Sequence, residues 1–145
     1  ATDLIDLDLA YAPPYGQAKD PVNQTGMVAH NVVTGELVLT GPDALTEDMP
    51  VLNVRTVGEY AAGHMPNSLN IPHTQLRDRL DEVRTWVETS VGDQPFVVMC
   101  AAGVRSWIGY RIVRHAGFNV TMLSGGIQTL RAWLGDRAAT VLVKE

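Results

Sequence analysis

The chain has 145 residues, of which 46% are hydrophobic and 19% are charged, and its formal net charge at pH 7 is −5. This size and composition suit one compact globular domain with an appendage. The acidic balance, without a cluster of lysine and arginine, argues against nucleic acid as a partner. No apolar stretch approaches the roughly 20 residues of a membrane helix, so we expect no membrane span.

The first third of the chain differs in composition from the rest. Prolines at positions 13, 14 and 21 exclude one continuous helix across residues 1–35. Residues 21–33 are nevertheless predicted to form a helix, because proline is tolerated in a first turn and Gly35 is placed to end it. We therefore treat residues 1–35 as separate from residues 36–145.

From residue 36 onward, short apolar strands alternate with amphipathic helices. Strands are predicted over 37–39, 51–54, 68–71, 95–99 and 120–123. Helices are predicted over 56–62, 76–87, 105–116 and 127–134, followed by an apolar tail over 140–143. Thr56 is the expected N-cap of the first of these helices. The alternation predicts a three-layer α/β fold with a central, mostly parallel sheet of about five strands and helices on both faces.

Two of these helices carry clear apolar stripes. Leu76, Leu80, Val83 and Val87 fall at helical offsets, and the charged residues between them face the opposite way. Ile108, Ile112 and Ala116 are expected to form the buried stripe of the helix over 105–116, with Gly117 as its cap.

Cofactor and metal motifs are not evident in this sequence. No histidine pairs with another, or with the cysteine, at ligand spacing, so no metal site is expected. The sequence also lacks the glycine-rich patterns of dinucleotide and triphosphate sites. A single cysteine excludes an internal disulfide, which favours a reducing, cytoplasmic setting.

That cysteine, Cys100, ends a predicted buried strand and opens a short loop of small residues before a helix. In such a loop the backbone N–H groups can point at the sulfur, with the helix N-terminus behind them. These amides, the helix dipole and Arg105 all favour the thiolate, so we expect a lowered thiol pKa. The other interpretation is a buried structural cysteine, but Gly103 and Arg105 favour a reactive one.

The position of Cys100 agrees with the predicted fold. In parallel sheets, ligands bind beyond the carboxyl ends of the strands, and Cys100 lies at such an end. The loop that would cradle an anion consists of Ala101, Ala102, Gly103, Val104 and Arg105.

Several ordered motifs carry a family resemblance. They are residues 51–56 with Glu59 and Tyr60, residues 63–68 with 70–72, residues 97–100 with 103–106, and residues 123–126 with Trp133. On these motifs the segment 36–145 resembles a rhodanese (sulfurtransferase) domain. The resemblance implies that Cys100 takes sulfur from a donor and holds it as a persulfide. A thiol or cyanide acceptor would then remove that sulfur.

The resemblance also implies supporting roles for Asn53, Arg55 and Ser106. The family usually has Asp where this chain has Asn53, so the site loses one negative charge. Arg55 and Glu59, four residues apart, are expected to form a structural ion pair. His64 is expected to order its turn rather than to transfer protons.

The first segment resembles a different family. Residues 8–15, residues 18–23 and Gly26 look like the C-terminal end of the dimerisation domain of flavin-dependent coenzyme A-disulfide reductases. Some members of that family carry a fused C-terminal rhodanese domain. Residues 1–35 would then be a remnant of the dimerisation domain plus linker. Composition alone favours a proline-rich linker.

This second resemblance implies a larger parent enzyme that binds FAD, NAD(P)H and coenzyme A, although this segment holds none of them. The expected partners are the parent's reductase domains, thiol acceptors and small sulfur donors. The donors considered are thiosulfate, polysulfide and a small persulfide such as coenzyme A persulfide. The uncharged loop residues favour a bulkier or less charged donor than thiosulfate.

Two other functions use similar features. Phosphatases and arsenate reductases with a Cys-loop-Arg cradle have one more residue than the four that separate Cys100 from Arg105, and no candidate general acid lies just downstream. Rhodanese-like domains also act as non-catalytic docking modules. The retained Cys100 favours catalysis, and the reactivity of its thiol would distinguish the two.

Overall fold

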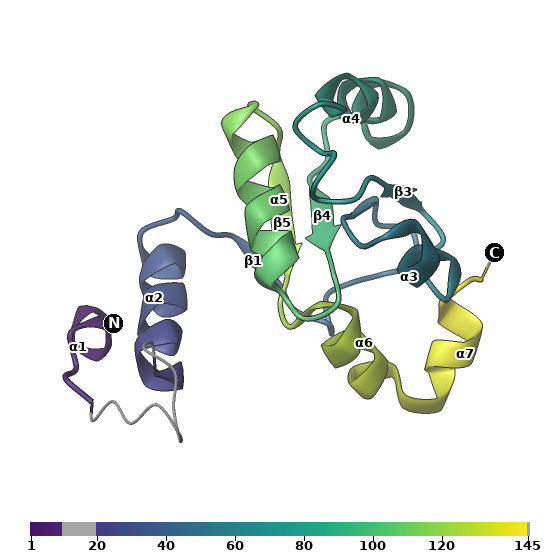
Figure 1. The fold of residues 1–145 in the computed structure, drawn as a ribbon. Coiled ribbons are helices and arrows are strands. Elements are labelled where there is room, and N and C mark those ends of the chain that lie inside the picture. The colour runs from purple at the N-terminus through teal and green to yellow at the C-terminus, as the bar shows by residue number, and fades with distance from the viewer. Residues whose placement is uncertain (10–19, 145) are drawn as a thin grey trace. The chain divides into compact units, whose positions relative to one another are not determined.

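The computed structural model describes residues 1–9 and 20–144, which fall into two compact units over 1–38 and 39–145. Figure 1 shows the helices and strands of both. The first unit contains α1 (Thr2–Ile5) and α2 (Pro21–Val33). The helix predicted over 21–33 is therefore confirmed, whereas α1 was not predicted. Of the residues that carry the second resemblance, 10–15, 18 and 19 lie outside the described residues.

Local interactions fix α2 and its contact with α1. Asp20 caps α2 by accepting a 2.9 Å hydrogen bond from the N–H of Val22. Asn23 donates to the carbonyl groups of Leu4, Ile5 and Leu7, each at 3.1 Å. Gly26 lets the helices approach, because a Cβ atom there would lie 2.7 Å from Leu4 Cβ.

The second unit is built on a five-stranded sheet. Its strands are β1 (Leu39–Thr40), β2 (Val51–Asn53), β3 (Ser68–Asn70), β4 (Phe96–Met99) and β5 (Val120–Leu123). Their spatial order is β1-β5-β4-β2-β3, and every neighbouring pair is parallel. The predicted α/β fold with a parallel sheet is confirmed. All four residues of β4 are buried, as expected for the central strand of such a sheet.

Five α-helices belong to this unit in the described residues. They are α3 (Val57–Ala61), α4 (Leu80–Trp86), α5 (Val104–His115), α6 (Gly126–Leu134) and α7 (Ala138–Val141). A π-helical segment, η1 (Val87–Val91), continues α4, and a 3-10 turn, η2 (Gly135–Arg137), joins α6 to α7. The described part of the chain has no helix that is both long and apolar enough to span a membrane.

Helices cover both faces of the sheet. Val97 and Met99 of β4 lie in one core cluster with Ile127 and Leu130 of α6. Val98, which points to the opposite face, lies beside α5: a Cβ atom on Gly109 would be 3.3 Å from Val98 Cγ1. Figure 1 shows α5 along the sheet and α6 near the lower ends of the strands.

The helix predicted over 76–87 differs from the structure. Residues 73–79 form successive turns, closed by bonds such as Gln75 N–H to the Pro72 carbonyl (2.8 Å) and Asp78 N–H to the Gln75 carbonyl (3.1 Å). Leu76 is fully buried from this turn. Its spacing from Leu80 therefore reflected shared burial and not a shared helix. Val87 lies in the π-helical segment, which sequence periodicity did not indicate.

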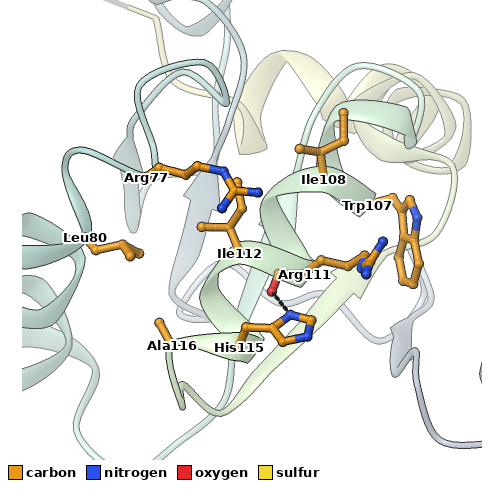
Figure 2. Close-up of a pocket in the computed structure, with 8 residues that line it drawn as sticks. All are labelled: Arg77, Leu80, Trp107, Ile108, Arg111, Ile112, His115 and Ala116. Carbon is orange, nitrogen blue, oxygen red and sulfur yellow. Dashed lines mark hydrogen bonds between the residues drawn. The ribbon is translucent and has the colours of Figure 1, made fainter.

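The predicted stripe of α5 is wrong at Ile108, which is 42% exposed. The buried positions of this helix are Ser106, Gly109, Tyr110, Ile112 and Val113. Gly109 allows this approach, since a Cβ atom there would lie 3.1 Å from Val54 Cγ1. Ile108 is rotated away from the sheet and instead lines an open pocket, shown in Figure 2.

The C-terminal apolar tail predicted over 140–143 is partly helical. It includes the end of α7, and Val143 then pairs antiparallel with His64 through two backbone hydrogen bonds of 3.0 Å. His64 is buried, its Nδ1 lies 3.0 Å from the Tyr60 carbonyl, and its ring stacks on Tyr60 at 3.7 Å. This placement gives His64 the turn-ordering contacts that were expected.

The order of the strands also indicates where a ligand would bind at the edge of the sheet. The chain leaves β2 toward β3 and leaves β4 toward β5, so the connections diverge between β2 and β4. In open α/β sheets such a divergence marks where ligands bind, beyond the carboxyl ends of the strands.

Candidate active site

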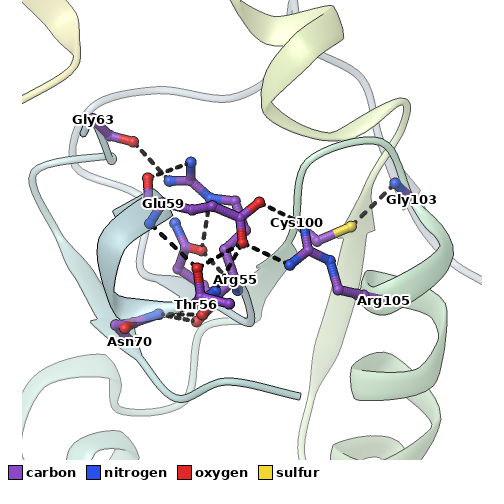
Figure 3. Close-up of polar contacts among 9 residues, drawn as sticks. Arg55, Thr56, Glu59, Gly63, Asn70, Cys100, Gly103 and Arg105 are labelled. Atoms are coloured by element: carbon purple, nitrogen blue, oxygen red, sulfur yellow. Dashed lines mark hydrogen bonds and ion pairs between the residues drawn. The ribbon is translucent and has the colours of Figure 1, made fainter. Parts of the chain in front are cut away.

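Cys100 lies at this point of divergence, directly after β4. Asn53 and Arg55 lie at the end of β2, where Asn53 is in register with Met99. The Cys100 residue is 1% exposed, and its Sγ accepts a 3.1 Å hydrogen bond from the N–H of Gly103. Figure 3 shows the sulfur beside Arg105 and the polar residues that follow β2.

The N-terminus of α6 orients the loop that begins at Cys100. The N–H groups of Ile127 and Gln128 donate to the carbonyl oxygens of Cys100 and Ala101, at 2.9 and 3.1 Å. In a trans peptide the N–H points opposite to the C=O, so the amides of Ala101 and Ala102 face away from α6. Gly126 is needed here, because a Cβ atom would lie 2.6 Å from the Ala101 carbonyl oxygen.

The loop then turns into α5 at Gly103, whose φ of 128° disfavours any residue with a side chain. Val104 and Arg105 form the first turn of α5, and the side chain of Val104 is 76% exposed. Ala102 is exposed as well. Because the side chains of Ala102 and Val104 point to solvent, the groups of this loop that face the sulfur are backbone amides.

The surroundings of Cys100 have opposing effects on its pKa. Burial raises the pKa, whereas hydrogen bonding from the Ser106 hydroxyl and from the amides of Gly103, Ser106 and Ala102 lowers it. The hydrogen bonds prevail, and the thiol pKa falls below its ordinary value of 9.0. Ser106 Oγ is buried and forms no hydrogen bond of standard geometry within the described residues. The Cys100 thiolate is the acceptor that would satisfy this hydroxyl.

Arg105 is held mainly by Glu59, and it also interacts with the Cys100 sulfur. Its Nη1 and Nη2 atoms lie 2.7 Å from the two carboxylate oxygens of Glu59. This bidentate pair raises the pKa of Arg105 and lowers that of Glu59 from 4.5 to about 2. Glu59 also forms a capping box with Thr56 at the start of α3, which fixes the carboxylate on the rim of the site.

The expected Arg55–Glu59 ion pair is therefore wrong. Arg55 reaches only the backbone carbonyl of Glu59, at 2.7 Å, because its side chain is directed inward and the residue is 3% exposed. The Glu59 carboxylate meets Arg105 instead, across 46 positions of sequence. The sequence signal for Glu59 as a site residue was the capping-box spacing from Thr56.

Arg55 is surrounded by neutral acceptors. Its Nε donates to Asn53 Oδ1 at 3.1 Å, and its Nη2 donates to the Gly63 carbonyl at 2.6 Å. Its own backbone N–H also donates to Asn53 Oδ1, at 3.2 Å. Burial lowers the pKa of Arg55 from its ordinary value, but a guanidinium stays charged in proteins. The Nδ2 of Asn53 is buried and has no hydrogen-bond partner within the described residues.

The structure thus brings Cys100, Gly103, Ser106 and the Ala102 amide together, and places Arg105, Arg55 and Asn53 around them. Within the described residues, no three His, Cys, Asp or Glu side chains gather as a metal site. Chemically, the arrangement offers a buried thiol with lowered pKa and N–H and O–H donors aimed at an anion.

Comparison with known proteins accounts for this arrangement. The family model of the rhodanese-like domain matches residues 41–132, more than half of the chain. The chain belongs to the rhodanese-like domain family.

Two solved structures resemble most of this rhodanese-like chain. Reduced CoADR-RHD of Bacillus anthracis is 34% identical, with a TM-score of 0.82, over 93% of this chain and 24% of that one. A NAD-dependent persulfide reductase from A. fulgidus is 39% identical, with a TM-score of 0.74, over 88% of this chain and 22% of that one.

Curated relatives of the rhodanese-like chain have other activities. An HTH-type transcriptional regulator of Mycobacterium tuberculosis is 30% identical over 126 residues, which are 86% of this chain and 47% of the regulator. A tRNA uridine(34) hydroxylase of Escherichia coli is 32% identical over 111 residues, which are 74% of this chain and 30% of the hydroxylase. The chain spans less than half the length of these relatives.

Proposed function

We propose that this rhodanese-like domain is a sulfurtransferase that carries sulfane sulfur as a persulfide on Cys100. The observation that carries the proposal is the thiol itself, whose pKa is lowered by the Ser106 hydroxyl and by loop amides despite its burial. A lowered pKa increases the fraction of thiolate at a given pH, and the thiolate is the form that acts as a nucleophile.

The reaction proceeds in two displacements. With a persulfide donor, the Cys100 thiolate attacks the outer sulfur and forms a new S–S bond. The donor's own S–S bond breaks, and its inner sulfur leaves as a thiolate with the electron pair. In the second step an acceptor thiolate attacks the outer sulfur of the Cys100 persulfide, and the Cys100 thiolate is regenerated. The cycle involves no net oxidation, and it is a covalent, ping-pong mechanism.

The loop supports both steps. The amides of Ala102 and Gly103 and the Ser106 hydroxyl stabilise the attacking and leaving thiolate, because each can donate to a sulfur anion. The remaining amides, of Ala101, Val104 and Arg105, are proposed to cradle the outer sulfur. The Glu59 carboxylate offsets part of the charge of Arg105, which also interacts with the Cys100 sulfur.

The larger context is also a proposal. We infer that residues 1–35 derive from the dimerisation domain of a coenzyme A-disulfide or persulfide reductase, with the rhodanese-like domain following it. The 93% coverage by CoADR-RHD supports this, because it exceeds the share of the chain in the second unit alone. The parent enzyme would supply the sites for FAD, NAD(P)H and coenzyme A, in the cytoplasm, and its reductase domains would be partners.

Two observations favour a second candidate, a non-catalytic docking module. Curated relatives include a transcriptional regulator, and the Cys100 residue is 1% exposed. In this alternative the thiol would be inert, and the domain would serve only to bind another protein.

A turnover assay separates the two candidates. The wild-type protein and Cys100→Ser are each supplied with thiosulfate, polysulfide or coenzyme A persulfide, and with cyanide or a thiol as acceptor. The sulfurtransferase proposal predicts transfer by the wild type and none by Cys100→Ser. Ser106→Thr, which keeps a hydroxyl, is a folded control expected to retain activity. Equal background rates for wild type and Cys100→Ser with every donor would support the docking module.

A further inference from the structure

A second site opens on the outer side of α5. The pocket has a volume of about 640 Å³, within the usual range for small-molecule sites. Figure 2 shows α5 between Trp107 on one side and Arg77 and Leu80 on the other. The lining residues are Arg77, Leu80, Trp107, Ile108, Arg111, Ile112, His115 and Ala116.

The charges of this pocket oppose those of the whole chain. Three of its eight lining residues, Arg77, Arg111 and His115, carry basic groups and none is acidic, although the chain has a net charge of −5. Neither Arg77 nor Arg111 forms an ion pair with a carboxylate in the part of the chain that the structure describes. Their guanidinium groups are therefore available to an anionic ligand.

His115 presents one nitrogen to the same space. Its Nδ1 lies 2.7 Å from the Arg111 carbonyl oxygen. Figure 2 marks this hydrogen bond with a dashed line. A carbonyl oxygen only accepts hydrogen bonds, so Nδ1 is the protonated nitrogen and Nε2 remains for a ligand.

The rest of the pocket is apolar and aromatic. The Trp107 ring stacks on Tyr110 with a centroid distance of 5.9 Å, and the Arg111 guanidinium lies 5.7 Å from the Trp107 ring centroid. Ile108, at 42% exposure, adds an apolar surface that a bare inorganic anion would not use. An organic phosphate with a flat aromatic portion fits both halves of this lining.

The pocket adjoins the Cys100 loop. Trp107 follows Ser106, which lowers the pKa of the Cys100 thiol. From Trp107, the lining extends along α5 to His115, roughly 12 Å at 1.5 Å per residue. A ligand bound along this face thus has one end near the start of α5, where the loop meets the helix and Arg111 lies over the Trp107 ring, and the other end near His115.

From these observations we propose that the α5 pocket binds the phosphorylated nucleotide end of a thiol or persulfide whose sulfur reaches Cys100. This inference rests on the proposed sulfurtransferase function and specifies its substrate class. The uncharged loop would accept the sulfur, while recognition of charge takes place on α5.

The first test needs no sulfur chemistry. Adenosine 3′,5′-bisphosphate, adenosine and inorganic phosphate are titrated into the protein by calorimetry. The variants are the double change Arg77→Gln and Arg111→Gln, and Arg114→Gln, a matched control on α5 outside the pocket. The bisphosphate should bind more tightly than either fragment, and the double variant should weaken it about tenfold while the control does not. Binding that is absent, or unchanged in the double variant, overturns the proposal.

The second test uses transfer kinetics. The double variant should raise KM for coenzyme A persulfide, but it should leave KM for inorganic polysulfide unchanged. If Cys100 accepts sulfur from both donors and neither KM changes, the pocket proposal fails and the sulfurtransferase function stands. If no donor loads Cys100, the sulfurtransferase function fails, and the bisphosphate titration alone decides whether the pocket is a nucleotide site.

Discussion

Two arginines flank the Cys100 loop, and their surroundings differ in kind. Arg55 is 3% exposed and donates to an amide oxygen and two backbone carbonyls. Arg105 is partly exposed and forms a bidentate pair with the Glu59 carboxylate. Burial lowers the pKa of Arg55, whereas the hydrogen bonds from Arg105 to Glu59 raise the pKa of Arg105.

This difference shows that two arginines, and not one, bring positive charge to the thiol. Sequence alone gave that role to Arg105, at the far end of the loop. In the structure both arginines interact electrostatically with Cys100. Arg105 is paired with the Glu59 carboxylate, while Arg55 has no carboxylate hydrogen-bonded to it in the described residues. The neutral Asn53 adds no negative charge beside Arg55, whereas a carboxylate at that position would offset the charge of Arg55.

The largest effect is expected when Arg55, the buried arginine, is replaced. Arg55→Met would remove the side-chain donor of the Glu59 and Gly63 carbonyls and one of the two donors to Asn53 Oδ1, and we expect the free energy of unfolding to fall by about 3 kcal/mol. Arg105→Met removes a partly exposed ion pair and should cost only about 1 kcal/mol. Denaturant unfolding of both variants measures this, and equal losses would contradict the distinction between the two arginines.

Asn53→Asp would give Arg55 a carboxylate partner, as Arg105 already has in Glu59. The new charge should raise the pKa of Cys100 and slow its alkylation at neutral pH roughly tenfold, as a shift of one pKa unit implies. The rate of iodoacetamide modification as a function of pH is the measurement. Asn53→Ala, which adds no charge, is the control. An unchanged alkylation profile for Asn53→Asp would show that Arg55 does not act on the thiol.

Ser106→Ala tests whether neutral donors stabilise the thiolate. The Ser106 hydroxyl forms no hydrogen bond of standard geometry within the described residues. Its loss should therefore change the free energy of unfolding by less than about 0.5 kcal/mol. It should still raise the pKa of Cys100 and slow alkylation several-fold, while Ser106→Thr should not. Loss of stability without a change in alkylation would give Ser106 a purely structural role.

The smallest expected effect concerns acid stability. The pKa of Glu59 is lowered from 4.5 to about 2, so its stabilising contribution is complete above pH 4.5 and is lost as the pH falls toward 2. Because the Glu59 side chain is 37% exposed, solvent screening limits this contribution to about 1 kcal/mol or less. Glu59→Gln should flatten this part of the pH–stability curve, and an unchanged curve would contradict the assignment.

Sequence periodicity predicted most of the sheet and helices, because strand burial and helical spacing are local properties. It failed at residues 73–79, where Leu76 is buried from a turn, and at Ile108, whose orientation depends on how closely Gly109 approaches the sheet. Both outcomes depend on packing between elements, which spacing within one element does not specify.

In the candidate site, too, the local features could be predicted from the sequence and the contacts between distant residues could not. Cys100 and its loop could be predicted, since a strand end, a glycine and a helix start are adjacent in sequence. The pairing of Glu59 with Arg105 could not, because it joins residues 46 positions apart and competes with a nearer arginine at helical spacing. Which partner Glu59 takes depends on Arg55 being directed into the interior, where it meets Asn53 and the Gly63 carbonyl.

The most direct measurement of the central claim is intact-protein mass spectrometry of the wild type and Cys100→Ser. Each protein is exposed to thiosulfate, polysulfide or coenzyme A persulfide and then to a thiol acceptor. If Cys100 carries the transferred sulfur, the wild type alone gains the mass of one sulfur atom and loses it when the acceptor is added. A folded wild-type protein that gains no sulfur from any donor, or a Cys100→Ser variant that gains it equally, would contradict sulfur transfer through Cys100.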